Sequence, residues 1–126
     1  MKINHIALNI ENKDEITNFY QNILCFKFEY DFDMPFSLSS DIFGIENSTK
    51  VYLVKKENTI LELFMHSVKS NIGYAHICLD VDNRENTAVK CNEEGYPVIR
   101  IERNDKTDLL FIKDKNGNIF ELKDKS

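Results

Sequence analysis

The sequence predicts an α+β fold built from two tandem βαβββ modules. The first observation is an internal repeat, because the six residues that begin at His5 (HIALNI) match the six that begin at His76 (HICLDV). Both copies alternate along the chain in the way that is typical of a half-buried strand. The second observation is that a helix pattern and then three strand patterns follow each copy. The predicted single domain covers residues 1–126, with module 1 at 1–66, a linker at 67–73 and module 2 at 74–126.

The first half is predicted to contain a strand near residues 2–10, a helix over 13–24 and strands near 26–32, 50–56 and 59–66. Asn12 and Glu15 form a capping-box pattern at the start of the helix. Five apolar residues then recur at helical spacing and form one stripe that a sheet can cover: Ile16, Phe19, Tyr20, Ile23 and Leu24.

The second half is predicted to contain a strand near 74–82, a helix over 84–94 and strands near 97–103, 107–113 and 118–123. Asp82 and Glu85 repeat the capping-box pattern, and Gly95 is expected to end the helix. Asn116 followed by Gly117 predicts a tight turn before the last strand.

The stretch from Asp31 to Ser48 makes the first half longer than the second. It is rich in apolar residues, namely Phe32, Met34, Pro35, Phe36 and Phe43. One interpretation is a lid over a site, because long loops in compact domains are often functional. The other is a satellite strand with hydrophobic contacts of its own.

The composition limits the function classes. The net charge is −5 and the Lys and Arg residues are scattered, which argues against nucleic acid as a partner. No apolar run is long enough to span a bilayer and no signal-peptide pattern precedes the first strand, so no membrane partner is expected. The three cysteines are odd in number and lack paired spacing, which is typical of reduced thiols in a cytoplasmic protein.

Two histidines and two glutamates occupy matched positions in the two halves. His5 and Glu62 lie in strand patterns of the first half, and His76 and Glu121 lie in those of the second. A carboxylate inside an apolar strand is costly unless another group compensates for its lost hydration. Since side chains alternate across a strand, all four are expected on the faces opposite the aliphatic ones. Imidazoles and carboxylates on one concave surface suit a divalent metal ion, and the alternative is an empty or vestigial site.

The chain resembles the vicinal oxygen chelate superfamily, which includes glyoxalase I, bleomycin-resistance proteins and extradiol dioxygenases. The resemblance covers nearly the whole chain and is most specific at 74–82 (YAHICLDVD) and 111–122 (FIKDKNGNIFEL). It implies that the two modules form a cup-shaped curved sheet, and it implies a homodimer. The order His, Glu, His, Glu is similar to that of glyoxalase I. That similarity implies one divalent ion (nickel, cobalt, manganese, iron or zinc) bound by His5, Glu62, His76 and Glu121.

The resemblance also implies a function. The expected activity is that of a metal-dependent lyase or isomerase, which removes a proton from a small carbonyl or thioester substrate. Glu121 is the expected base and Glu62 is the second choice. The alternatives are a metal-free protein that binds a drug or metabolite, as in bleomycin resistance, and a thiol transferase or dioxygenase of the same superfamily.

Five further residues are expected to line a substrate pocket: Asn9, Phe64, His66, Cys78 and Phe111. Cys78 can alternatively serve as a small buried apolar residue. Glyoxalase I usually has an arginine four residues after its first ligand and an asparagine four residues after its second, and both bind glutathione. Here Asn9 and His66 occupy those positions, so the bidentate recognition of a carboxylate by arginine is lost. The sequence therefore argues against glutathione as the thiol partner.

Overall fold

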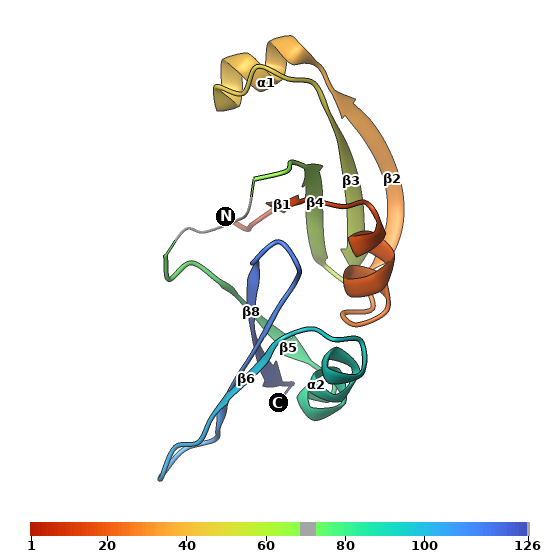
Figure 1. Ribbon diagram of the computed structural model, residues 1–126. Coiled ribbons are helices and arrows are strands. Elements are labelled where there is room, and N and C mark those ends of the chain that lie inside the picture. The colour runs from red at the N-terminus through yellow and green to blue at the C-terminus, as the bar shows by residue number, and fades with distance from the viewer. Residues whose placement is uncertain (69–72, 126) are drawn as a thin grey trace. The chain divides into compact units, whose positions relative to one another are not determined.

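The computed structural model describes residues 1–68 and 73–125 of the chain. The chain divides into two compact units, unit 1 (Met1–Lys69) and unit 2 (Ser70–Ser126), and each has a four-stranded sheet (Figure 1). Of the predicted linker at 67–73, residues 69–72 lie outside the described residues.

Unit 1 contains, in chain order, β1 (Ile6–Ile10), the π-type helix η1 (Ile16–Gln21), β2 (Lys27–Met34), α1 (Phe36–Phe43), β3 (Thr49–Lys56) and β4 (Thr59–Met65). The sheet order is β1-β4-β3-β2, with β1 parallel to β4 and the other neighbours antiparallel. The pairing of β2 shifts register between Phe28 and Tyr30. Because a bulge of this kind bends a strand, it accounts for the curved ribbon of β2 in Figure 1.

Unit 2 contains β5 (Ile77–Val81), α2 (Arg84–Glu93), β6 (Val98–Ile101), β7 (Leu109–Lys113) and β8 (Ile119–Asp124). The sheet order is β5-β8-β7-β6, again with the first strand parallel to the last and the other neighbours antiparallel. Apart from the additional helix α1 between β2 and β3 of unit 1, each unit therefore has the strand, helix, strand, strand, strand order of the repeat. The predicted α+β fold of two βαβββ modules is confirmed.

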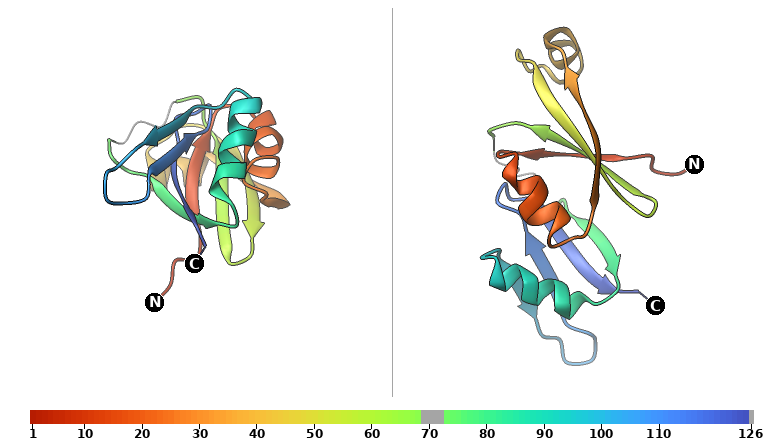
Figure 2. Two further views of the ribbon diagram at one scale, coloured as in Figure 1. Left: turned by 90° about the horizontal axis from the view of Figure 1, so that it is seen from below. Right: turned by 90° about the vertical axis from the view of Figure 1, so that its right-hand side faces the viewer.

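The helices bury apolar side chains. The five residues of the stripe predicted for the first helix are all buried. In unit 2, α2 lies along one face of the β5-β8-β7-β6 sheet (Figure 2) and buries Ala88 and Cys91. The aliphatic residues of the inner strands, such as Leu63 of β4 and Leu122 of β8, are also buried. The opposite strand faces, which carry the candidate site residues, are thus left more accessible.

The stretch from Asp31 to Ser48 contains a helix that the sequence does not predict. β2 continues to Met34, and the extended backbone of Pro35 (φ −68°, ψ 158°) leads into α1. The helix ends at Gly44, whose left-handed φ of 67° is typical of a C-terminal cap. The satellite-strand interpretation is therefore wrong. Figure 1 shows α1 at the end of β2 that lies away from η1.

Several predicted boundaries also differ from the structure. The first helix, predicted over 13–24, is the shorter π-type η1 (Ile16–Gln21). The sequence predicts both candidate histidines within strands, but β1 and β5 begin one residue later, at Ile6 and Ile77. The sequence predicts Asp82 as the cap of the second helix, but the side chain of Asn83 accepts the hydrogen bond from the Asn86 N–H, at 3.0 Å. Asp and Asn cap helices about equally well, so composition cannot choose between neighbours.

No helix among the described residues has the length and apolar character needed to cross a membrane.

Candidate metal-binding site

In unit 1, His5 and Glu62 form a close pair at the parallel strands β1 and β4. The strand register aligns Ala7 with Glu62, so the residue just before β1 lies beside the carboxylate. His5 Nε2 lies 3.3 Å from Glu62 Oε1. The other ring nitrogen, His5 Nδ1, lies 3.1 Å from the side-chain oxygen of Asn4. The imidazole is 41% exposed and the carboxylate 18% exposed, so solvent can reach the pair.

Unit 2 repeats this arrangement with His76 and Glu121. The register aligns Cys78 with Glu121, which is the same offset as between Ala7 and Glu62. His76 Nε2 lies 3.7 Å from Glu121 Oε1, and His76 Nδ1 lies 2.8 Å from the carbonyl oxygen of Tyr74. The predicted ligands are therefore brought together as two pairs, one in each unit.

The donor atoms of each pair fit a metal ion. The Tyr74 carbonyl can only accept a hydrogen bond, so Nδ1 of His76 carries a proton, and a metal ion can take the place of any proton on Nε2. The side-chain oxygen of Asn4 has the same effect on His5. In both pairs Nε2 then faces a carboxylate oxygen, which is unfavourable unless a cation or a proton lies between them. An oxygen that holds the second ring nitrogen is also typical of metal-binding histidines.

A single pair is a small ligand set. Within residues 1–68 and 73–125, no group of three or more His, Cys, Asp or Glu side chains is close enough to hold a metal ion. Three or four protein ligands are usual in zinc sites, whereas each pair offers two. Each pair by itself therefore has fewer donors than such a site.

The two oxygens of Glu121 have different neighbours. Oε1 faces His76, whereas Oε2 accepts a hydrogen bond from the Cys78 thiol at 3.5 Å and lies 3.8 Å from Lys123 Nζ. Cys78 is exposed, so its alternative role as a small buried residue is wrong; partial desolvation, and then the hydrogen bond to Glu121, raise the pKa of its thiol. Cys78 is thus a protonated donor to the carboxylate, which argues against a nucleophilic thiol. The Phe111 ring contacts the His76 ring edge-on, with 5.7 Å between centroids.

A turn closed by a side chain precedes the strand that carries Glu121. Asp114 Oδ1 accepts hydrogen bonds from the backbone N–H groups of Asn116 and Asn118 at 2.9 and 2.8 Å. Gly117 has a φ of 89°, which residues with a Cβ rarely adopt. The predicted Asn116-Gly117 turn is confirmed. Asp114 lies in the motif 111–122 that the sequence singles out, but its role in closing the turn was not predicted, although Asp is a common turn residue.

A cavity of about 430 Å³ is lined by residues of unit 1. Asn9 and Phe64 line it from the strands that hold His5 and Glu62, and His66 lines it just beyond the end of β4. Phe43 of α1 and Asn47 of the following loop form the other wall. Three of the five predicted pocket residues therefore share one cavity, and the other two, Cys78 and Phe111, lie beside Glu121 in unit 2. The cavity wall that Phe43 of α1 forms was not predicted from the sequence, because no helix was predicted at these residues.

Unit 2 has a hollow of its own, of about 600 Å³, that reaches Glu121. Its walls carry many charged side chains: Arg84, Arg103, Lys106, Asp108, Lys123 and Asp124. The guanidinium of Arg84 donates to the carbonyl of Asp108 at 2.8 Å, and the backbone N–H of Arg84 donates to Asp124 Oδ1 at 2.7 Å. Arg103 donates to the Thr107 carbonyl from two nitrogens. Both arginines therefore hold the wall together.

Several solved structures have the same fold. A glyoxalase family protein from Enterococcus faecalis aligns with a TM-score of 0.72 and 23% identity, over 96% of this chain and 95% of that one. A glyoxalase family protein from Bacillus cereus aligns with a TM-score of 0.75 and 12% identity, over 97% and 92%. A mutant of the fosfomycin resistance protein FosX from Listeria monocytogenes, complexed with Mn(II) and 1S,2S-dihydroxypropylphosphonic acid, aligns with a TM-score of 0.75 and 16% identity, over 99% and 93%. At these identities the alignments show a shared fold.

Sequence comparison adds the family. No curated protein matches the chain. A family model described as the Glyoxalase/Bleomycin resistance protein/Dioxygenase superfamily matches residues 2–122. That match covers nearly the whole chain and agrees with the fold of two βαβββ units. The chain belongs to the Glyoxalase/Bleomycin resistance protein/Dioxygenase superfamily.

Proposed function

We propose that this protein is a divalent-metal-dependent lyase or isomerase that removes a proton from the carbon next to a carbonyl or thioester group of a small substrate. In this proposal one metal ion is bound by His5, Glu62, His76 and Glu121. The observation that carries it is the equivalence of the two pairs, in which Nε2 faces Oε1 at 3.3 Å in unit 1 and 3.7 Å in unit 2.

The second carboxylate favours proton abstraction over oxygen activation. Iron oxygenases of the 2-His-1-carboxylate type need one carboxylate and keep positions open for dioxygen and substrate. Here each histidine has a carboxylate of its own, so one carboxylate is available as a base. When bound, the cation would supply Lewis acidity that stabilises negative charge on a substrate oxygen.

Glu121 is the base in this proposal. Its Oε2 contacts the Cys78 thiol and the Lys123 ammonium group at 3.5 and 3.8 Å, which orients the carboxylate while Oε1 points toward His76. Asp114 supports this orientation because it fixes the turn before β8. Glu62 is assigned the ligand role beside His5.

A relative supports the metal and the kind of substrate. The FosX structure from Listeria monocytogenes contains Mn(II) together with a small dihydroxy phosphonic acid. We infer that this chain also takes one divalent ion, from among nickel, cobalt, manganese, iron and zinc, and a small-molecule substrate. Zn²⁺, Ni²⁺ and Co²⁺ all accept imidazole ligands, so the donor set alone does not select one of them.

We also propose a homodimer. In each unit taken alone, the sheet has two outermost strands, and each of them has one edge without a neighbour in that sheet. Open edges favour pairing with, or cover by, another chain. Light scattering at micromolar concentration should give about twice the chain mass of 14.8 kDa, and a monomer would contradict this part of the proposal.

Solvent-deuterium exchange tests the chemistry. Metal-loaded protein in D2O should exchange the proton next to the carbonyl of a true substrate, and mass spectrometry measures the label. Glu121→Gln should lower the rate at least about 100-fold, because general base catalysis typically contributes that much. Glu102→Gln, which changes an exposed glutamate, is the control and should leave the rate unchanged. An unchanged rate in Glu121→Gln would rule out Glu121 as the base.

A metal titration tests the ligand set. His5→Ala and His76→Ala should each lower the affinity for Mn(II) at least about 100-fold, because each removes one of the four donors. His66→Ala is the matched control, since the third histidine lines the cavity and lies outside both pairs. Unchanged affinity in His76→Ala would overturn the ligand assignment.

A second candidate function is small-molecule binding without catalysis. The cavity of unit 1 favours it, because its walls include none of the four proposed ligands. Tight binding of a small molecule in the presence of EDTA, with no deuterium exchange by the metal-loaded protein, would support this candidate over the enzyme.

A further inference from the structure

We infer that the cavity of unit 1 binds an uncharged, ring-bearing part of the ligand and excludes anionic groups. This inference rests on the proposed function in that it names the substrate class of the same site. The cavity volume of about 430 Å³ lies in the range of roughly 300–1,000 Å³ that is usual for small-molecule sites.

The cavity begins next to the proposed ligand Glu62. The register aligns Ala7 with Glu62 and Asn9 with Phe64, and Ala7, Asn9 and Phe64 all line the cavity. Side chains two positions apart along a strand lie on the same face, about 7 Å from one another. A ligand whose reactive end lies at Glu62 therefore extends along the strands toward Phe64 and α1.

Two aromatic rings from opposite walls meet in the cavity. Phe43 of α1 and Phe64 of β4 are in edge-to-face contact, with 5.8 Å between centroids and 66° between ring planes. Phe43 is nevertheless 51% exposed, so much of its ring is available for a further contact. Aromatic side chains contribute most when another flat or apolar group covers them, so this pair favours a ring-bearing ligand.

The described lining contains no Asp, Glu, Lys or Arg. Its polar groups are the amides of Asn9 and Asn47, the hydroxyl of Ser48 and similar side chains, with His66 as the one titratable group among them. Neutral donors and acceptors of this kind suit carbonyl, amide or hydroxyl groups. An anion placed there would lose its hydration without gaining a guanidinium or ammonium partner.

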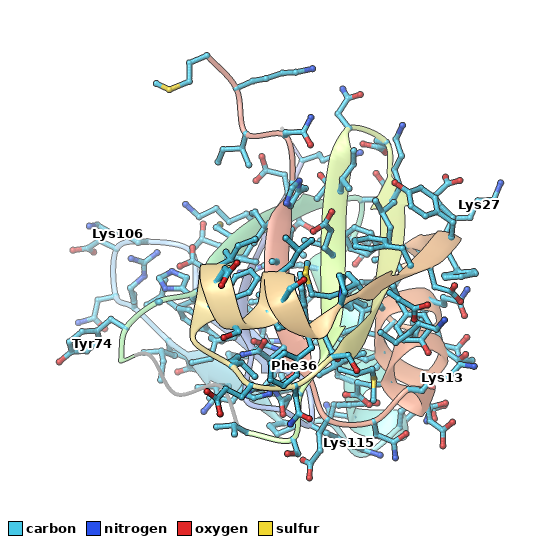
Figure 3. The ribbon with its side chains drawn as sticks, turned by 90° about the horizontal axis from the view of Figure 1, so that it is seen from above. Lys13, Lys27, Phe36, Tyr74, Lys106 and Lys115 are labelled. Carbon is cyan, nitrogen blue, oxygen red and sulfur yellow. The ribbon has the colours of Figure 1, made fainter. Side chains whose placement is uncertain are left out.

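The lysine that follows a lining residue directly in the sequence, Lys50, forms ion pairs with aspartates. Lys50 follows Thr49, which lines the cavity, but its ammonium group lies 3.1 Å from Asp33 and 3.7 Å from Asp31. Lys27 extends outward from the beginning of β2 (Figure 3). The lysines of β2 and β3 thus leave the lining of this cavity neutral.

A matched pair of fluorescent probes tests the inference. N-phenyl-1-naphthylamine is uncharged, and 8-anilinonaphthalene-1-sulfonate has the same rings with one sulfonate added. Titrations in EDTA, followed by probe emission, should show that the neutral probe binds at least about tenfold more tightly than the anionic one. Repeating them with Mn(II) should preserve this preference, because neither probe needs the metal.

Four substitutions link the preference to the cavity. Phe43→Ala should lower the affinity for the neutral probe about tenfold, and Phe64→Leu should lower it about threefold. Phe36→Ala is the control: Phe36 begins the same helix (Figure 3), is also half exposed and does not line the cavity. Asn9→Arg should raise the affinity for the anionic probe at least about threefold, because it places a cation in the cavity wall. Circular dichroism confirms that each variant folds.

Equal affinity for the two probes would overturn the inference. Unchanged binding by a folded Phe43→Ala variant, together with an unchanged response of Asn9→Arg, would show that the probes bind elsewhere and would also overturn it. Failure of the proposed function is separately visible. In that case His76→Ala leaves metal affinity unchanged, while the probe preference and its loss in Phe43→Ala remain.

Discussion

The two units place a His–Glu pair at the same strand register but support it by different means. In unit 1, η1 buries large rings: Tyr20 packs against Phe19 of the same helix and against Phe26 of the segment that follows, at 5.1 and 6.5 Å between centroids. In unit 2, α2 is held by charged groups. Arg84 is hydrogen-bonded to Asp108 and Asp124, and Arg100 of β6 forms a bidentate ion pair with Glu85.

This difference separates two requirements of the fold. The ligand positions depend on the parallel pairs β1–β4 and β5–β8, whose registers are equivalent. The helix on the other face of each sheet only has to cover it, and either large rings or small residues with ion pairs can do so. The surroundings of the two pairs also differ in charge: the cavity of unit 1 has a neutral lining, and the hollow of unit 2 has a charged one.

The largest expected effect tests the packing difference between the helices. Phe19 is fully buried, and Phe19→Ala should lower the free energy of unfolding by about 4 kcal/mol, because it leaves a cavity the size of a ring. Cys91→Ala, at a fully buried position of α2, should cost about 1 kcal/mol because it removes one sulfur atom. Urea unfolding followed by circular dichroism measures both. Equal losses would contradict the contrast drawn between aromatic and small-residue packing.

The second effect compares the turns that lead into the glutamate strands. Asp114 is buried and accepts three hydrogen bonds, including one from the Asn118 amide at 2.7 Å. Asp114→Ala should therefore lower the free energy of unfolding by about 3 kcal/mol, because it leaves buried donors unsatisfied. In unit 1, the turn before β4 is exposed at Glu57 and Asn58, so Asn58→Ala should cost under about 0.5 kcal/mol. Thermal unfolding of the two variants tests this ranking, and similar losses would contradict it.

The third effect concerns a buried thiol of unit 2. Burial raises the pKa of Cys91 to about 11, whereas an ordinary thiol has a pKa of about 8.5. At pH 8 its thiolate fraction is therefore about 100-fold lower than that of an ordinary thiol. Cys91 should react with iodoacetamide at least about 100-fold more slowly in the folded protein than in urea, with the rate rising as the pH approaches 11. Peptide mass spectrometry follows this site, and the exposed Cys25 of unit 1 serves as the internal control. Fast labelling of Cys91 in the folded protein at pH 8 would contradict this prediction.

The same contrast explains which features could be predicted from the sequence. The stripe from Ile16 to Leu24 is local and periodic, so the burial of the first helix follows directly from it. The equivalence of His5 with His76 is visible because the repeat preserves strand register. By comparison, α1 spans only eight residues, too few to establish a helical period, and it leaves Phe36, Ile42 and Phe43 about half exposed. Its exposed apolar residues resemble those of a loop.

Non-local contacts account for the remaining differences. The cavity wall formed by Phe43 depends on α1, and sequence reasoning found only the strand side of the cavity, at Asn9, Phe64 and His66. The hydrogen bond between Cys78 and Glu121 depends on the alignment of β5 with β8, which connects residues far apart in the chain. Asp82 and Asn83 are neighbours with similar capping propensities, so only the backbone path decides which of them caps α2.

The smallest expected effect concerns the hydrogen bonds before the two helices and refines their comparison. The N-cap of η1 is Glu15, which makes no side-chain cap hydrogen bond, so the predicted capping box with Asn12 is wrong. Asn83 accepts a hydrogen bond from the N–H of Asn86 at the start of α2, and Asn12 accepts one from the N–H of Asp14 before η1. Asn83→Ala should lower the free energy of unfolding by about 1 kcal/mol, and Asn83→Ser should restore most of it because serine also caps. Asn12→Ala should cost about 0.5 kcal/mol, because the aromatic core of unit 1 holds η1 in place independently of its first turn. Urea unfolding of the three variants measures these differences. A larger loss in Asn12→Ala than in Asn83→Ala would show that η1 depends on the Asn12 hydrogen bond more than on its rings, which would reverse the distinction between the two units.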